Sequence, residues 1–170
     1  MNRPTTLGFL ASALVMALPL VAGCGNDRAA SAVSYTAADL ATGSEVSVSS
    51  LRGTPVLLVS WATWCNECDE ELSGLQDFAE SNAADGITIV AVNIDASDVG
   101  DEINAKIDKH GLTTSLWRDK RNEFKRAFGA LGVPTTVLLD ANGAMVGLFA
   151  GAVDFHEQQV LDALEEVRGT

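Results

Sequence analysis

Two cysteines three positions apart, Cys65 and Cys68, are the residues of this 170-residue chain that point most directly to chemistry. They stand in the segment Trp-Cys-Asn-Glu-Cys (64–68), between an apolar run and an acidic segment. If a helix begins there, its free N–H groups favour a thiolate on Cys65, which we expect to be exposed, and Cys68 can close a disulfide with it. The same spacing also occurs in zinc sites, so the neighbouring sequence has to decide between redox chemistry and metal binding.

Apolar patterns on either side of the cysteine pair predict the elements that position it. The continuous apolar run at 56–59 is typical of a strand covered on both faces, and apolar residues at helical spacing predict a helix from Cys65 to about Ala83. Asn142-Gly143 favours a tight hairpin between the last two strands. By the same rules, the other elements are expected as strands at 34–40, 46–49, 87–92, 115–117, 135–139 and 145–149, and as helices at 99–109, 124–128 and 155–167.

This order of elements predicts an α/β fold. Strand–helix–strand units followed by a hairpin and a helix argue for a central mixed β-sheet flanked by helices on both faces. The strands at 34–40 and 46–49 add an N-terminal β-hairpin. With 47% hydrophobic residues in the chain, a domain of about 135 residues can form one core without a disulfide that only stabilises the fold.

The first residues are typical of an export signal. Arg3 precedes an apolar run at 7–21, which is shorter than the roughly 18 to 20 residues that a membrane-spanning helix needs. The run ends in Val-Ala-Gly-Cys (21–24), small residues where a signal peptide would be cleaved. This pattern resembles the bacterial lipobox, which implies cleavage before Cys24 and attachment of lipid to its sulfur. An ordinary signal peptide or an uncleaved anchor are the alternatives.

The lipobox divides the chain into a lipoprotein signal peptide (1–23), a lipidated Cys24 with a flexible tether (24–33), and one domain (34–170). The processed protein would then be a cell-membrane lipoprotein on the extracytoplasmic face, held by acyl chains. This assignment leaves Cys65 and Cys68 as a pair, because the chain has three cysteines. The formal charge of −12 argues against nucleic acid and anionic lipid surfaces as partners.

Two segments far apart in the sequence resemble one known family. Trp-Ala-Thr-Trp-Cys-Asn-Glu-Cys (61–68) and Gly-Val-Pro-Thr-Thr (132–136), with Leu-Arg-Gly (51–53) and Asp-Ala-Asn-Gly (140–143), are similar to thioredoxin-like proteins. More narrowly, they resemble the membrane-anchored TlpA/ResA-type (DsbE-like) thiol–disulfide oxidoreductases, from about Tyr35 to the C-terminus. The resemblance implies a thioredoxin-like fold and an enzyme without cofactor or metal. Its partners would be protein thiols and disulfides, such as an apocytochrome during cytochrome c maturation, and a membrane-embedded electron donor or acceptor.

Thiol chemistry assigns the roles of the two cysteines. Cys65, nearer the helix tip, is expected to attack a disulfide of a partner, and Cys68 then resolves the mixed disulfide. By resemblance, the Val133–Pro134 bond is cis and brings the Val133 backbone beside the cysteines, where an extended substrate would pair with it. The alternative for Pro134 is a proline that merely opens a strand.

Two further residues complete the predicted site. By resemblance, Glu71 accepts the proton of Cys68 during resolution, the alternative being a plain surface acid. Trp64 is expected to offer partners an apolar surface beside Cys65. The remaining residues considered fall into three groups: core for Trp61, Trp117 and Met145, surface for His110 and His156, and a solvated helix face for Asp69 and Glu70.

The direction of electron flow follows from charge. The acidic residues around the pair oppose a thiolate on Cys65, which destabilises the reduced form and favours a reductase with a potential near thioredoxin's roughly −270 mV over an oxidant near roughly −120 mV. An oxidant that introduces disulfides into exported proteins is the first alternative. A Sco-like copper-binding module is the second, although that family spaces its cysteines one residue further apart and adds a histidine. A thiol peroxidase is the third.

Overall fold

The computed structural model describes residues 31–169 together with Met1. The expected signal peptide (1–23), Met1 apart, the lipidated Cys24 and the tether as far as residue 30 therefore lie outside the described residues. No helix among the described residues is both long and apolar enough to cross a membrane.

The described part of the chain folds around a mixed sheet of seven strands in the order β2-β1-β5-β4-β3-β6-β7. β3 and β4 are parallel, as are β4 and β5, whereas the other neighbours are antiparallel. β3 lies between two neighbours, and all six of its residues are buried, as its unbroken apolar run predicts. The strands are β1 Thr36–Asp39, β2 Glu45–Ser47, β3 Val56–Trp61, β4 Thr88–Asn93, β5 Ser115–Arg118, β6 Thr135–Leu139 and β7 Met145–Ala150.

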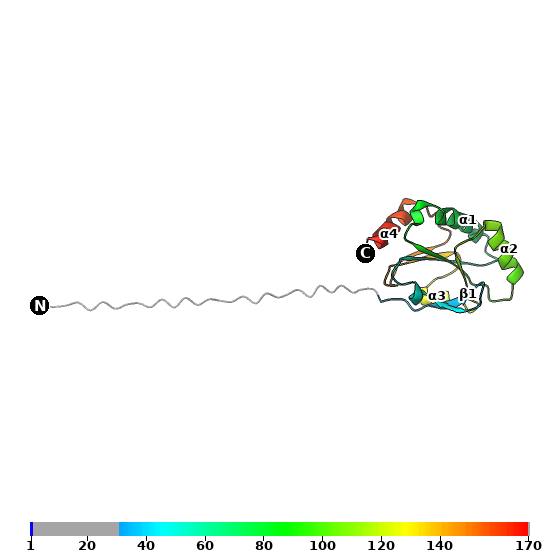
Figure 1. The fold of residues 1–170 in the computed structure, drawn as a ribbon, viewed down its shortest axis with the longest axis horizontal. Coiled ribbons are helices and arrows are strands. Elements are labelled where there is room, and N and C mark those ends of the chain that lie inside the picture. The colour runs from blue at the N-terminus through cyan, green and yellow to red at the C-terminus, as the bar shows by residue number, and fades with distance from the viewer. Residues whose placement is uncertain (2–30, 170) are drawn as a thin grey trace.

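The helices cover both faces of the sheet. They are α1 Glu67–Ala79, α2 Gly100–His110, α3 Glu123–Phe128 and α4 Gln158–Arg168, with short 3₁₀ turns at Val48–Leu51 and Asn82–Ala84. The successive parallel connections β3-α1-β4 and β4-α2-β5 step in the same direction across the sheet, so right-handed crossovers place α1 and α2 side by side on one face. Figure 1 shows α1, α2 and α4 on that face and α3 on the other.

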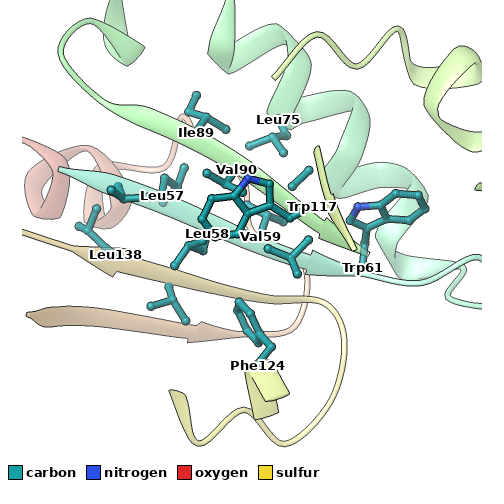
Figure 2. Packing of buried hydrophobic residues seen from close by; sticks show 14 of the residues in the cluster. Leu57, Leu58, Val59, Trp61, Leu75, Ile89, Val90, Trp117, Phe124 and Leu138 are labelled. Atoms are coloured by element: carbon teal, nitrogen blue, oxygen red, sulfur yellow. The ribbon is translucent and has the colours of Figure 1, made fainter. Parts of the chain in front are cut away.

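The core lies on both sides of β3 and β4. In Figure 2, Leu75 of α1 packs on one side of these strands and Phe124 of α3 lies on the other. Tyr35, just before β1, contacts the rings of Trp117, Phe124 and Phe128 and closes the second face. The N-terminal hairpin thereby belongs to the core.

The structure confirms the predicted fold class: a mixed sheet flanked by helices, with an antiparallel hairpin of β1 and β2 at the N-terminus. The predicted helix 65–83 is shorter at both ends. The N–H of Cys65 bonds to the carbonyl of Ala62 in a turn before α1, and the N–H of Glu80 closes the helix on Gln76. The spacing of apolar residues indicates that a helix is present but does not define the residues at which it begins and ends.

Trp61 and Trp117 are buried, as predicted. The prediction of a core position for Met145 is wrong. Its side chain is 37% exposed because β7 is an edge strand, one face of which lies outside the core.

Candidate active site

The two cysteines form a disulfide at the N-terminal end of α1, with 2.11 Å between their sulfurs. Cys68 is completely buried, and Cys65 is 6% exposed. The expectation that Cys65 is exposed is therefore wrong for the oxidised protein, although Cys65 is the more accessible of the two. The backbone N–H of Cys68 donates to the Cys65 sulfur at 3.1 Å. Such a donor stabilises negative charge, so a thiolate is favoured on Cys65.

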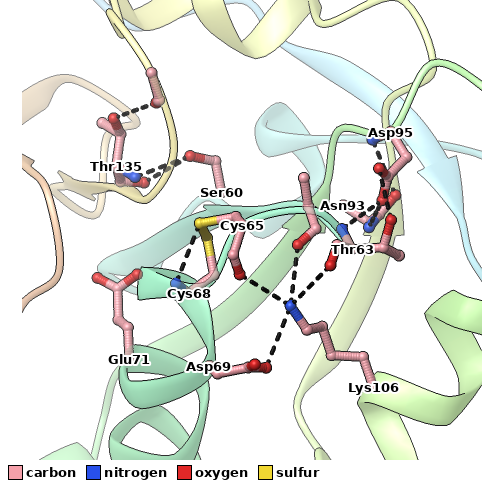
Figure 3. The surroundings of a disulfide bond; sticks show 12 residues. Ser60, Thr63, Cys65, Cys68, Asp69, Glu71, Asn93, Asp95, Lys106 and Thr135 are labelled. Carbon is pink, nitrogen blue, oxygen red and sulfur yellow. Dashed lines mark hydrogen bonds and ion pairs between the residues drawn. A yellow bond between two sulfur atoms is a disulfide. The ribbon is translucent and has the colours of Figure 1, made fainter.

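The loop that carries Cys65 is fixed from two sides (Figure 3). On one side, the ammonium of Lys106 from α2 donates to the carbonyl oxygens of Ala62, Thr63 and Cys65 at 3.3, 3.2 and 3.0 Å. On the other side, the carboxylate of Asp95 accepts from the backbone N–H of Thr63 at 2.9 Å and from its hydroxyl at 3.0 Å. The peptide groups before the disulfide therefore have few alternative conformations.

Asp95 is itself held by a buried polar network at the ends of β4 and β5. The side-chain amide of Asn93 donates to Asp95 at 2.8 Å, and the guanidinium of Arg118 lies 4.0 Å from the same carboxylate. Arg118 also donates to the Asn93 side chain and to the carbonyl of Ser97. Both Asn93 and Asp95 are buried, so these bonds satisfy groups that would otherwise be costly to bury.

Asp69, one position after Cys68, is the centre of an ion cluster. Its carboxylate lies 3.2 Å from Lys106, 3.2 Å from Lys109 and 2.9 Å from the His110 ring. Burial disfavours the ionised form of Asp69, but the hydrogen bonds and charges of these three partners outweigh it and lower the pKa of Asp69 to about 2. The prediction of a solvated helix face is therefore wrong for Asp69.

His110 was expected at the surface, and that prediction is also wrong. Its side chain is 4% exposed and lies between Asp69 and the Ser73 hydroxyl, which is 2.8 Å from its Nδ1. His110 is buried because of a tertiary contact. The packing of α2 against α1 brings a helix-terminal histidine onto the first turns of α1, which the local sequence of α2 does not record. His156 is exposed, as predicted.

The segment Gly-Val-Pro-Thr-Thr (132–136) lies against the strand that leads to the cysteine segment (61–68). The Val133–Pro134 peptide bond is cis, as the resemblance implies, and Pro134 is buried. The Ser60 hydroxyl on β3 donates to the carbonyl of Thr135 at 3.0 Å and accepts from its N–H at 3.1 Å. The Thr135 hydroxyl donates to Gly132 at 2.8 Å and so closes the loop around the cis bond. Ser60 therefore joins the strand that leads to Cys65 with the loop that carries Pro134.

Glu71 faces the interior one turn after Cys68. It is 2% exposed, so the alternative of a plain surface acid is excluded. Its Oε1 accepts from the Thr136 hydroxyl at 3.0 Å and from the Val153 N–H at 3.3 Å, whereas its Oε2 has no partner among the described residues. Burial raises the pKa of Glu71 to about 7 even though both hydrogen bonds oppose the rise.

Comparison with known proteins identifies the family of the chain. The model of the AhpC/TSA family matches residues 29–147, which is more than half of the chain. The chain belongs to this family. The chain is similar to the thiol-disulfide oxidoreductase ResA of Oceanobacillus iheyensis, at 34% identity over 72% of this chain and 59% of that protein. It is also similar to ResA of Geobacillus kaustophilus, at 30% identity over 75% and 74% of the two chains.

A solved structure agrees with these relatives. A putative thiol:disulfide interchange protein DsbE from Chlorobium tepidum matches 78% of this chain and 94% of its own with a TM-score of 0.67 and 29% identity. The protein is thus a thiol–disulfide oxidoreductase of the ResA and DsbE type with a thioredoxin-like fold, and Cys65–Cys68 is its disulfide.

The oxidoreductase exposes large apolar side chains on the two segments that carry Cys65 and Pro134. Trp64 is 67% exposed, in agreement with the prediction of an apolar surface beside Cys65. Leu131, three positions before Pro134, is 89% exposed and was not predicted. Its signal was an apolar residue followed by glycine in the loop before Val-Pro, a place with no strand or helix to bury it. Both exposed side chains belong to segments of the predicted site, Trp64 beside Cys65 and Leu131 in the loop before Pro134.

The structure thus brings most predicted site residues together. Cys65 lies just before α1 and is bonded to Cys68 in its first turn, which is followed by Glu71. The hydrogen bond from Thr136 to Glu71 ties the segment after Pro134 to that helix. Cys24 lies outside the described residues. Three residues that fix the site were missed: Ser60, Asp95 and Lys106. Within the described part of the chain, no three His, Cys, Asp or Glu side chains gather as metal ligands would.

Proposed function

We propose that the protein is an extracytoplasmic thiol–disulfide oxidoreductase that reduces disulfides of protein partners through Cys65 and Cys68. The observation that carries this proposal is the position of the couple, with the Cys68 N–H 3.1 Å from the Cys65 sulfur at a helix N-terminus. An N–H at that position stabilises the attacking thiolate but cannot act on the Cys68 sulfur in the same way. The two sulfurs are therefore unequal, as sequential exchange requires.

In the reductase direction, the reduced protein begins the cycle. The Cys65 thiolate attacks one sulfur of the partner's disulfide. A Cys65–partner disulfide forms, the partner's S–S bond breaks, and one partner thiolate leaves. Cys68 then loses its proton and attacks the Cys65 sulfur, which forms the Cys65–Cys68 disulfide and releases the second partner thiolate. Two electrons pass from the protein to the partner, and a membrane-embedded donor would return them.

Glu71 is proposed to accept the Cys68 proton in the second step. Its carboxylate lies one helical turn after Cys68, is buried, and has a pKa of about 7, near the pH at which a base is both ionised and basic enough to act. The free Oε2 supports this role, because Oε1 already accepts two hydrogen bonds.

Val133, Trp64 and Leu131 are proposed to bind the partner. Within the described residues, neither the N–H nor the C=O of Val133 has a hydrogen-bond partner, so both can pair with an extended segment. Trp64 and Leu131 are exposed on the segments that carry Cys65 and Pro134, where they would cover the reacting sulfurs once a partner has bound.

Trapping tests the exchange. In Cys68→Ser, the mixed disulfide at Cys65 cannot be resolved, so partners such as an apocytochrome or other exported proteins should stay attached and be released by dithiothreitol. Cys65→Ser is the matched control and should trap none. Equal trapping by both variants, or no reduction of the wild-type disulfide by dithiothreitol, would contradict the proposal.

The reductase direction is open to a separate measurement. Asp69 does not support the reductase direction, because two lysines neutralise its carboxylate. Glu67 and Glu70, which are exposed acids of the same turn, still support it. We expect the midpoint in glutathione buffers near roughly −270 mV; a midpoint above roughly −180 mV would favour the oxidant that introduces disulfides.

Localisation is proposed as a lipoprotein anchored through Cys24. The sequence before Cys24 supports an export signal. Labelled fatty acid should be incorporated into the wild type, and the protein should sediment with membranes. Cys24→Ser should lose the label; its retention there would contradict lipidation of Cys24.

A further inference from the structure

Lys106 is a lysine of α2 whose side chain is 11% exposed. An ammonium has three N–H donors, and this one faces three carbonyl oxygens of the loop before α1 as well as the Asp69 carboxylate at 3.2 Å. Nothing in the exchange reaction requires a lysine there. Its contacts, however, are all with the loop that carries Cys65 and with the residue after Cys68.

Three carbonyl oxygens directed at one point repel each other unless a cation lies between them. In this loop, the oxygens of Ala62, Thr63 and Cys65 converge on the Lys106 ammonium (Figure 3). Ala62 and Thr63 belong to the turn that leads to Cys65, and the third residue is Cys65 itself. The cation therefore stabilises the backbone conformation in which the Cys68 N–H reaches the Cys65 sulfur.

The Lys106 charge also lies beside the backbone of Cys65. Its shortest contact to the loop, 3.0 Å, is with the carbonyl of Cys65 itself. A nearby positive charge favours a thiolate, and Asp69 moderates this effect without cancelling it, since Lys109 and the His110 ring also contact that carboxylate. We propose that Lys106 is a positioning residue for the redox couple, which holds the Cys65 loop and raises the acidity of the Cys65 thiol.

This inference rests on the proposed function, because it concerns the cysteine that attacks. Its test uses the reduced protein and two readouts that a merely structural lysine would not change. One is the rate at which iodoacetamide alkylates Cys65 as a function of pH, and the other is the equilibrium with glutathione.

In Lys106→Met, we expect alkylation at pH 7 to slow by about threefold to tenfold and its midpoint to move to higher pH. The glutathione equilibrium should shift toward the disulfide by a similar factor, about 30 mV for a tenfold change. Lys109→Met is the matched control. Lys109 is 59% exposed, contacts the same Asp69 carboxylate and is not bonded to the loop, so its variant should change either readout by less than about twofold.

Asp69→Asn keeps the lysine and its carbonyl contacts but removes the negative charge, so it should change alkylation in the opposite direction and make Cys65 more reactive. It also provides a test if Lys106→Met does not fold. A shift of the same sign in Asp69→Asn and Lys106→Met, or no shift in Lys106→Met with an intact fold, would overturn the proposal for Lys106. These outcomes differ from the one that would contradict the proposed function, namely a wild-type disulfide that dithiothreitol cannot reduce.

Discussion

The buried carboxylate of Glu71 makes the stability of the oxidised protein depend on pH, and its replacement by glutamine tests this. The pKa of Glu71 rises from an ordinary value of 4.5 to about 7 because the side chain is buried. The folded protein therefore retains a proton that the unfolded chain has already lost between these two pH values. The associated stability is complete below about pH 4.5 and is lost as the pH rises toward about 7.

The size of this change in stability follows from the two pKa values of Glu71, 4.5 in the unfolded chain and about 7 in the folded protein. A rise in pKa from 4.5 to about 7 corresponds to about 3 kcal/mol of unfolding free energy over the whole window, of which about 2.5 kcal/mol falls between pH 5 and 8. In Glu71→Gln, the amide oxygen can still accept from Thr136 and Val153. The amide nitrogen replaces the Oε2 atom that has no partner, at a cost of about 1–3 kcal/mol that is the same at every pH.

The measurement is urea unfolding of the oxidised proteins at pH 5 and pH 8. The disulfide keeps both cysteines from titrating, so they do not contribute. The stability of Glu71→Gln relative to the wild type should rise by about 2.5 kcal/mol between the two pH values. Glu70→Gln, an exposed neighbour on α1, should change this difference by less than about 0.5 kcal/mol. The reasoning on burial is refuted if Glu71→Gln and the wild type depend on pH in the same way.

Further substitutions test the supports of the site. Asp95→Ala removes the acceptor of two Thr63 hydrogen bonds in a buried network and should lower the unfolding free energy by about 2–4 kcal/mol in urea; a loss below about 1 kcal/mol would show that the loop does not need Asp95. Trp64→Ala should slow exchange with a protein disulfide at least about fivefold and leave reduction by dithiothreitol unchanged, whereas equal slowing of both would place Trp64 outside partner binding. Tyr35→Phe removes a buried bond to Asp119 and should cost about 1 kcal/mol of stability, measured by thermal unfolding.

The parts of the site that the sequence predicts are those encoded by neighbours along the chain. The cysteine pair is a short pattern that stands soon after the buried strand β3. The cis bond before Pro134 is implied by the family resemblance, because the residues alone also fit a proline that opens a strand. The role of Glu71 is implied by the family resemblance, in which a glutamate stands three residues after the second cysteine. The cysteine pair and the elements around it are predicted from the residues themselves, because spacing along the chain fixes them.

The parts that could not be predicted depend on contacts between elements. Lys106 and His110 reach α1 only because two right-handed crossovers step in the same direction and place α2 beside it. Asp95 bonds to the backbone of Thr63 in the loop after β3, and Ser60 bonds to the backbone of Thr135 in β6. A side chain bonded to a remote backbone leaves no spacing in the sequence to detect. Met145 fails for a similar reason, since the apolar alternation of a strand does not reveal whether it lies at an edge.

Contacts between elements also change the charge around Cys65, on which the predicted direction of electron flow depends. Along the sequence, Asp69 adds negative charge beside the cysteines. In the fold, two lysines and a histidine from α2 surround it, and one of those lysines contacts the Cys65 carbonyl. The field at Cys65 is therefore less negative than the run of acids suggests, and the reduced form is more stable than that run alone would allow. A potential higher than thioredoxin's roughly −270 mV, measured together with its fall in Lys106→Met, would attribute the difference to α2 and not to the residues between the cysteines.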